Sequence, residues 1–417
     1  MFTTFGILFY YLLLGFLLYR ILRKKEFSLS VTEVALTFGF KAGMACLYGY
    51  IFLKFYGGDD TWVFHRMGLM EYEKLIHDPA QFFIDLLPVS AIQGADSFSQ
   101  ALGFYNMDLE YRSFYKILGI SNIFSRGNYY INAVFFSFVT FWGHYWLFKL
   151  LSREMPSKRK LLLLLIFFFP PVVFWLSGIR TDGLLLFFLS LSLLHFSNWI
   201  KNRKRSSLVY FLLSMLGVLV YRNVLLMLMA PALMAWFLVA RYQTKPFLTF
   251  FSAYGIAALL FFGTLLLSPT KNLPAVVASR QHEFLALTGN TRFRLDSLEA
   301  SVGSYMKVLP QAANNTFLRP YFWEAKGVLQ LITAAGILFF WILVIVVIVR
   351  NDQPWSVFFQ NPLHLFLVFF AISLYLFVGY TVPFPGAIVR YKSIPELLLL
   401  SVMVLNIRMW KNRIQKD

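Results

Sequence analysis

The stretch KFYGGDDTWVFHRMG (residues 54–68) lies where a long apolar segment ends and a polar loop begins. About 22 mostly uncharged residues precede it, enough for a helix to cross the apolar core of a bilayer. Gly57 and Gly58 allow the backbone to turn sharply and to approach a ligand closely. Asp59 and Asp60 follow, and carboxylates near lipid are costly unless they are solvated, paired or bound to a cation. Taken alone, such a pair is more often the hydrated start of a loop, but the rest of the chain favours a functional role.

The composition indicates an integral membrane protein. Hydrophobic residues make up 59% of the 417 residues and charged residues only 14%, with 48 Phe and 22 Tyr. Apolar runs of about 20 residues recur along the chain, and each is long enough to span a bilayer. We therefore expect an all-α, polytopic transmembrane helical bundle that forms a single domain over residues 1–417. The single Cys46 lies inside one of these runs, which excludes an intramolecular disulfide.

The excess of basic residues marks membrane topology. Lys and Arg number 38 against 20 Asp and Glu, a net charge of +18. Most of them form short clusters between apolar runs, which is typical of the cytoplasmic side and of contacts with anionic membrane lipids. This placement argues against nucleic acid as a partner. The clusters are Arg20/Arg23/Lys24/Lys25, Arg153/Lys158/Arg159/Lys160, Lys201/Arg203/Lys204/Arg205, Arg241/Lys245 and Arg408/Lys411/Arg413/Lys416.

If these basic clusters lie on the cytoplasmic side, the apolar runs form about eleven spans, with the N-terminus outside and the C-terminus inside. The first span has no basic segment or cleavage site before it, so we expect a retained helix. The spans are 3–22, 32–56, 129–150, 161–177, 183–200, 207–221, 224–240, 247–268, 328–349, 363–382 and 394–409.

Two long segments, 57–128 and 269–327, then become outer loops. Residues 67–87 have apolar residues at helical spacing, interrupted at Pro79, and residues 111–130 mix basic and aromatic side chains. Both are typical of helices that lie in the membrane interface.

The candidate functional residues all fall on the predicted outer face. Acids together with Arg and Lys at one depth suit a phosphorylated lipid, because guanidinium groups bind phosphate bidentately and a carboxylate accepts a proton or binds a cation. We expect these side chains to meet in one pocket at the outer edge of the bilayer. They are Asp59, Asp60, His65 and Arg66 in the first loop, Arg180 and Asp182 in a short turn, Arg280, His282, Glu283, Arg292, Arg294 and Arg319 in the second loop, and Arg390, Tyr391 and Lys392 in the last turn.

Each of these groups also has a structural interpretation. Arg180 and Asp182 can form a salt-bridged turn between antiparallel helices, and Arg390 and Lys392 can anchor a helix end by snorkelling. His65 is more often a loop or interfacial residue than a ligand. Arg222 beside Asn223 is a weaker candidate for a phosphate contact.

Three segments together resemble the C-type (GT-C) glycosyltransferases. They are the first outer loop with its acidic pair, FWLSGIRTDGLLLFFLSLSL (residues 174–193) and RYKSIPELLLL (residues 390–400). The similarity is to the branch with the lipid-A aminoarabinose transferases and protein O-mannosyltransferases, which shows an R-x-D-x-x-L-x-F-like pattern and an R-Y followed by a Pro. Arg180 through Phe187 match the first pattern, and Arg390, Tyr391 and Pro395 match the second.

The resemblance implies a GT-C fold and a transferase that moves a sugar from a polyprenyl-phosphate donor to a glycan, lipid or protein acceptor on the outer face. Asp59 or Asp60 would be the general base, would orient the acceptor, or would share a divalent cation such as Mg²⁺ or Mn²⁺, and Asp182 would assist at the metal or the acceptor. The remaining roles are donor-phosphate binding by Arg180, Arg390, Tyr391 and Lys392, and contacts to acceptor or donor by His65, Arg66, Arg280, His282, Glu283 and Arg319.

The chain departs from this family pattern in two ways. The acidic loop follows the second span instead of the first, and no large soluble C-terminal domain is present in the sequence. Both departures bear on how an acceptor is recognised. The abundance of Phe, Lys and Asn, with no eukaryotic targeting signal, favours a bacterial inner membrane with the active site on the periplasmic face.

Two other functions stay open. A glycan polymerase or ligase with a lipid-pyrophosphate donor would rely on Arg280, Arg292, Arg294 and Arg319 and would need no carboxylate base. A non-enzymatic flippase or transporter of lipid-linked glycans would need acids and bases inside the spans, which are nearly free of Asp and Glu.

Overall fold

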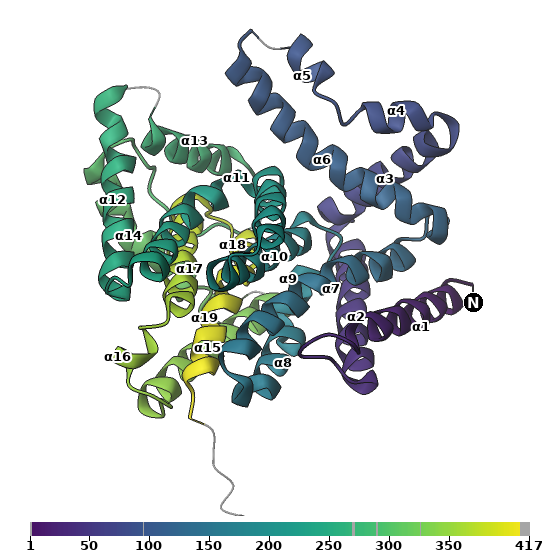
Figure 1. The fold of residues 1–417 in the computed structure, drawn as a ribbon. Helices are drawn as coiled ribbons and strands as arrows, with labels where there is room; N and C mark the ends of the chain where they lie inside the picture. Colours follow the sequence, from purple (N-terminus) through teal and green to yellow (C-terminus); the bar gives the residue numbers. More distant parts are fainter. Residues whose placement is uncertain (1, 95, 269–271, 289–290, 326, 409–417) are drawn as a thin grey trace, which may run out of the picture. The chain divides into compact units, whose positions relative to one another are not determined.

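A computed structural model describes residues 2–94, 96–268, 272–288, 291–325 and 327–408 (Figure 1). The basic residues Lys411, Arg413 and Lys416 of the last cluster lie outside the described residues, as do parts of the second loop at 269–271, 289–290 and 326. The chain divides into two compact units, Met1–Val224 and Leu225–Asp417, and each is considered separately below.

The described residues form helices and no strand; an isolated bridge pairs Asn351 with Ile407. The expected all-α class is therefore confirmed. The first unit contains α1 (Phe2–Leu22), α2 (Val31–Tyr56), α3 (Asp59–His77), α4 (Pro79–Ile84), α5 (Val89–Gln93), α6 (Phe98–Ser125), α7 (Tyr129–Glu154), η1 (Pro156–Lys158), α8 (Arg159–Phe168), α9 (Pro170–Ser177), α10 (Thr181–Asn202) and the first part of α11 (Arg205–Tyr242).

The second unit continues from α11. It contains α12 (Pro246–Leu267), α13 (Leu273–Ala286), α14 (Val302–Phe317), η2 (Phe322–Glu324), α15 (Val328–Val349), α16 (Trp355–Phe358), α17 (Pro362–Thr381), α18 (Pro385–Tyr391) and α19 (Ser393–Asn406).

Among the described residues, eight helices are long and apolar enough to cross a membrane, or nine if the bent pair η1/α8 and α9 is one span. That pair bends by 51° at Phe169, and Pro170 opens its second half. The count of eleven spans stays a prediction, and two elements account for the difference. α19 is shorter than the other candidates, and α11 runs through the expected boundary, with non-helical backbone angles at Arg222.

The segment expected to be the first outer loop is helical, as predicted, and the break at Pro79 is confirmed. Asp78 ends α3, and its side chain caps α4 by accepting a hydrogen bond from the Gln81 backbone N–H. The expected helix at 111–130 has different bounds, because α6 starts at Phe98 and ends at Ser125. The backbone then enters the left-handed region at Arg126 and Gly127, which ends a helix, and α7 begins at Tyr129.

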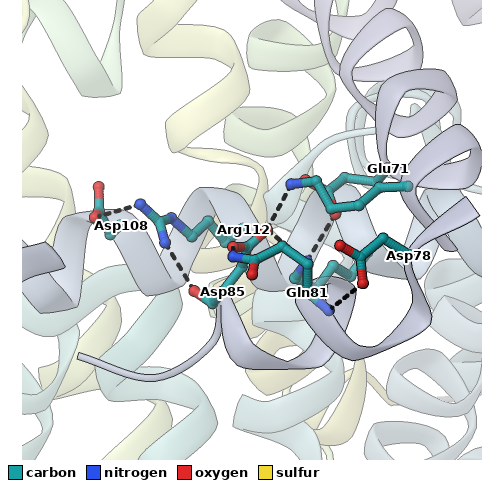
Figure 2. A network of polar contacts seen from close by, with 8 residues as sticks. Glu71, Asp78, Gln81, Asp85, Asp108 and Arg112 are labelled. Atoms are coloured by element: carbon teal, nitrogen blue, oxygen red, sulfur yellow. Dashed lines mark hydrogen bonds and ion pairs between the residues drawn. The ribbon is translucent and has the colours of Figure 1, made fainter. Parts of the chain in front are cut away.

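Charged side chains hold this loop together as an arm made of α3, α4 and α6. Lys116 of α6 is buried and pairs with Glu71 of α3 at 2.7 Å, while Lys74 pairs with both Glu71 and Asp85. Arg112 donates to the Asp85 carbonyl at 2.8 Å and pairs with Asp108. Figure 2 shows these contacts converging on Asp85, just after α4. The network fastens the end of α4 to both α3 and α6.

α7 is the central helix of the first unit. It packs against α10, α2 and α1, and most of its length is buried. Gly143 lies where α7 and α10 approach closely, since a Cβ there would be 2.7 Å from the Phe187 Cα. In the second unit, α17 packs in the same manner against α14 and α19. Both contacts bury apolar helix faces and define where the connecting turns emerge.

Candidate functional site

The acidic pair opens α3 at a sharp turn of the backbone. Gly57 (φ 69°) and Gly58 (φ 114°) occupy conformations that favour glycine, and Asp59 (φ 38°) is also left-handed. The turn places Asp59 and Asp60 in the first turn of α3, where the helix dipole favours negative charge. The glycines therefore form the sharp turn expected of them, between the end of α2 and the start of α3.

Arg180 meets both carboxylates, as expected from the sequence. Its Nη1 donates to Asp59 Oδ2 at 2.8 Å and to the Tyr48 hydroxyl at 3.3 Å, and its Nη2 pairs with Asp60. The Arg180 side chain is 5% exposed, whereas those of Asp59 and Asp60 are 34% and 57% exposed. The buried guanidinium thus anchors two acids that face outward.

The turn that carries Arg180 is short and held at several points. Gly178 leaves α9 in an extended conformation, and a Cβ there would be 2.8 Å from the Tyr48 ring. The Thr61 hydroxyl, one residue after the acids, donates to the Ile179 carbonyl at 3.2 Å. Arg180 itself is the N-cap of α10 with extended backbone. Side chains from α2 and α3 therefore both define the position of this turn.

The local electrostatics keep Arg180 charged. Burial alone would lower the pKa of the Arg180 guanidinium, but Tyr48, Asp182, Asp60 and Asp59 outweigh that effect and raise it. The acids compensate the positive charge of Arg180 and so stabilise the charged guanidinium in its buried position.

Asp182 has a different partner from the acidic pair. It lies in the first turn of α10 with a side chain only 7% exposed, and Arg222 Nη2 is 3.7 Å from its Oδ1. The backbone break at Arg222 (φ −165°, ψ 80°) within α11 coincides with this contact. Asp182 and Arg222 thus belong to the same cluster as Arg180, while Asp182 is less accessible than Asp59 or Asp60.

His65 and Arg66 have different environments. His65 is buried, 3.4 Å from Asn132 Nδ2, with its ring edge-on to Trp62 and Tyr129. Burial lowers the pKa of His65. The charge of Arg66 lowers this pKa further, whereas a hydrogen bond with the Gly127 backbone partly offsets the shift. These contacts fit a packing role between α3 and α7. Arg66 is exposed, so its expected contact with acceptor or donor stays a prediction.

The late basic turn belongs to the second unit. Arg390 ends α18, and its guanidinium lies over the Tyr391 ring at 4.4 Å. Lys392 is buried and Glu396 lies close enough to interact with its charge. Tyr391 also meets Phe284 of α13, with ring centroids 6.4 Å apart. The second outer loop therefore reaches α18.

The other candidates from the second loop lie around α13 and η2. Arg280 pairs with Glu283 three residues later, and His282 Nε2 is 3.0 Å from the Ser297 hydroxyl. Arg319 pairs bidentately with Glu324 and lies 3.9 Å from the centre of the Phe293 ring. These contacts leave Arg280, His282 and Glu283 exposed at the surface.

A cavity of about 320 Å³ opens beside Arg319. Its charged lining residues are Arg292, Arg319 and Glu324, and Thr291 and Gln330 add polar groups. Arg292 also lies 5.2 Å from the centre of the Phe384 ring. Two arginines at one cavity suit an anionic or saccharide group.

The divalent cation expected at Asp59 and Asp60 would meet a limited ligand set. Among the described residues, no three His, Cys, Asp or Glu side chains gather as a metal site. Both acids are paired with Arg180, which a cation would have to displace. The cation stays a prediction.

Three residues that position the site were not among the sequence candidates. Lys41 and Tyr48 of α2 and Thr61 of α3 all contact the turn that carries Arg180. Lys41 had a visible signal, because it is the one charged residue between positions 34 and 53 of a membrane helix. Tyr48 and Thr61 had none, since such residues are common in and near spans.

Comparison with protein-family models, curated proteins and solved structures finds no match for this chain. The function must therefore be inferred from the chemistry of the site.

Proposed function

We propose that this protein is a membrane glycosyltransferase that moves a sugar from a polyprenyl-phosphate donor to an acceptor on the extracytoplasmic face. The observation that carries the proposal is the buried Arg180 between two outward-facing carboxylates at the end of apolar helices. This arrangement suits a lipid-borne substrate, whose tail lies among helices while its polar headgroup lies at their ends. The sequence resemblance to GT-C enzymes independently favours the same chemistry.

Asp60 is the general base of the proposed reaction, because its side chain is the more exposed of the pair. It takes the proton from an acceptor hydroxyl as that oxygen attacks the anomeric carbon. The bond from that carbon to the phosphate oxygen breaks, and polyprenyl phosphate leaves with both electrons. Attack from the side opposite the phosphate inverts the configuration of the sugar.

Arg180 and Asp59 orient the base in this scheme. The sequence favours a phosphate-binding role for Arg180, but its partners are carboxylates, so we assign it to holding Asp60 in place. The donor phosphate then falls to Arg222, which borders Asp182, while the expected phosphate contacts of Arg390 and Lys392 stay a prediction from the sequence. Cations held ready for the charge that develops on the leaving phosphate are the largest expected contribution to catalysis.

The test is transfer of a radiolabelled sugar by the purified protein in nanodiscs, with a panel of polyprenyl-phosphate hexoses and pentoses. Asp60→Asn should lower transfer by about 10²–10⁴-fold, the usual contribution of a general base. Asp108→Asn, an exposed acid on α6 outside the site, is the matched control and should keep full activity. Full activity in Asp59→Asn, Asp60→Asn and the double variant would refute the proposal.

The cavity at Arg292 and Arg319 favours one second candidate, a glycan polymerase or ligase that uses a lipid pyrophosphate. Arg292→Gln distinguishes the two functions, because Arg292 is more exposed than Arg319 and has no ion pair with Glu324 to lose. A larger loss of activity in Arg292→Gln than in Asp60→Asn would favour the polymerase or ligase.

A further inference from the structure

Lys41 is a charged side chain buried inside a membrane helix. It lies near the middle of α2 and is fully buried. Its Nζ donates to the Leu176 carbonyl at 3.0 Å and to the Ser177 hydroxyl at 3.3 Å. A lysine amino group in such a place is costly unless its N–H groups are hydrogen-bonded.

Both acceptors belong to the last residues of α9. The final carbonyls of a helix have no partner within the helix, and they form the negative end of its dipole. At Gly178 the chain departs in an extended conformation (φ −54°, ψ 154°) instead of the left-handed one that commonly satisfies such carbonyls. The Lys41 ammonium therefore takes the place of a backbone cap at this end.

The capped end lies immediately before the functional turn. Only Gly178 and Ile179 separate Ser177 from Arg180. Lys41 and Tyr48 lie seven residues apart on α2, which places them on one face two turns apart. Lys41 holds the start of the turn, and the Tyr48 hydroxyl accepts a hydrogen bond from Arg180 at its end.

We propose that Lys41 is a positioning residue: by capping α9 it holds the turn so that the Arg180 guanidinium meets Asp59 and Asp60. Its catalytic consequence rests on the proposed glycosyltransferase function, but its structural consequence does not. Without the cap, the end of α9 is free to unwind or shift, and Arg180 loses its register with α3.

The experiment needs no substrate. It uses the reactivity of a cysteine thiol at position 60 to report whether Arg180 lies next to that position. In a Cys46→Ala background, Asp60→Cys places a thiol beside Arg180, whose charge favours the reactive thiolate. Alkylation rates across pH then report the thiol pKa. Arg180→Gln calibrates the loss of the contact and should raise that pKa by about one unit, so that alkylation near neutral pH slows about tenfold.

Lys41→Met should reproduce most of the Arg180→Gln effect, whereas Lys54→Met, an exposed lysine on the same helix, should leave the profile unchanged. If Lys41→Met does not fold, Ser177→Ala removes one of the two acceptors with little change in volume and should slow alkylation in the same direction. The proposal is overturned if the thiol in Lys41→Met or Ser177→Ala reacts as fast as in the parent protein while the thiol in Arg180→Gln reacts clearly more slowly. An unchanged profile in Arg180→Gln overturns it as well.

The catalytic arm separates this proposal from the proposed function. If transfer activity is found, Lys41→Met should lower kcat with little change in KM, because the donor site keeps its residues. If no transfer is found but the thiol profile shifts, the positioning role holds and the glycosyltransferase function fails.

Discussion

At the scale of single residues, the site depends on the geometry of one guanidinium. Arg180 has two nitrogens that face two different carboxylates, and it is far more buried than either partner. A planar, forked donor group meets this arrangement in a way that a single ammonium cannot. The positive charge of the Arg180 side chain and its forked shape therefore contribute separately to the pairing with the two acids.

Arg180→Lys tests this separation. The variant keeps a positive charge, but its point charge pairs well with only one acid, so we expect transfer to fall by about 10–100-fold, the equivalent of losing one charge-assisted hydrogen bond of about 1.5–3 kcal/mol. The melting temperature in detergent should change little, because no buried acid loses its counter-ion. Undiminished transfer in Arg180→Lys would show that charge alone suffices.

At the scale of helices and loops, a network of charged side chains joins the helices of the arm. The Asp85 carboxylate accepts hydrogen bonds from Lys74 and Gln81, and its backbone carbonyl accepts one from Arg112 (Figure 2). Burial alone would raise the pKa of Asp85, but the hydrogen bonds from Lys74 and Gln81 prevail and lower it below its ordinary 3.8. The pKa of Lys74 is raised: burial opposes this shift, and Asp85 and Glu71 cause it.

These shifts predict a pH window for the arm. A carboxylate whose pKa is lower in the folded state contributes its full stability above the unfolded value and loses it as the pH falls through the folded value. A lysine with a raised pKa contributes below its ordinary 10.5 and loses stability only above it. We expect hydrogen exchange of residues 79–85, corrected for intrinsic rates, to accelerate below about pH 4.

Asp85→Asn should accelerate this exchange at neutral pH and weaken its dependence on acid. Glu73→Gln, an exposed acid of the neighbouring helix turn, is the control. The charge-based account is contradicted if residues 79–85 of the wild-type protein stay protected from hydrogen exchange at pH values well below the folded-state pKa of Asp85.

The helix contacts of the second unit give a prediction about packing. Gly379 of α17 lies against α14 so closely that a Cβ would be 2.3 Å from the Ala312 carbonyl oxygen. Because the obstacle is backbone, Gly379→Ala must push the two helices apart, at a cost of about 1–3 kcal/mol. Gly303→Ala on α14, with nothing within 4 Å of the new Cβ, is the matched control. Equal melting temperatures for the two variants would contradict this packing.

At the scale of the whole molecule, the chain separates into two units with different chemical contents. The first contains the Arg180 cluster and the arm, and the second contains α18 and the arginine-lined cavity. The sequence predicts that the turns and loops of both sets lie on one side of the membrane. The basic clusters between spans predict that side to be the outer one.

Thiol labelling tests this orientation. In the Cys46→Ala background, Met70→Cys on α3 and Met306→Cys on α14 introduce thiols at exposed positions of the two predicted outer loops. Both should react with a membrane-impermeant maleimide in intact cells, because both loops are predicted to face outward. Lys204→Cys should react only after permeabilisation. Labelling of Lys204→Cys in intact cells would invert the topology and exclude an extracytoplasmic active site.

The sequence by itself determined the apolar helices and much of the loop architecture. A helix in lipid must satisfy its backbone hydrogen bonds within its own segment, so a local apolar run is sufficient to predict it. The break at Pro79 and the turn at Gly57 and Gly58 were readable for the same reason, since both are properties of the local backbone. The expected boundary between spans at 222–223 coincides with non-helical backbone at Arg222 inside α11, but local sequence does not decide whether the chain turns back there.

Only the tertiary structure decided the partners within the site. Arg180 and Asp59 are 121 residues apart, and Lys41 and Leu176 are 135 apart, so no local pattern relates them. Ion pairs and caps of this kind depend on which helix faces meet, and that depends on the packing of whole helices. The sequence therefore identified Asp59, Asp60 and Arg180 as candidates, while packing assigned Arg180 to the two acids and identified Lys41 as the residue that holds the turn.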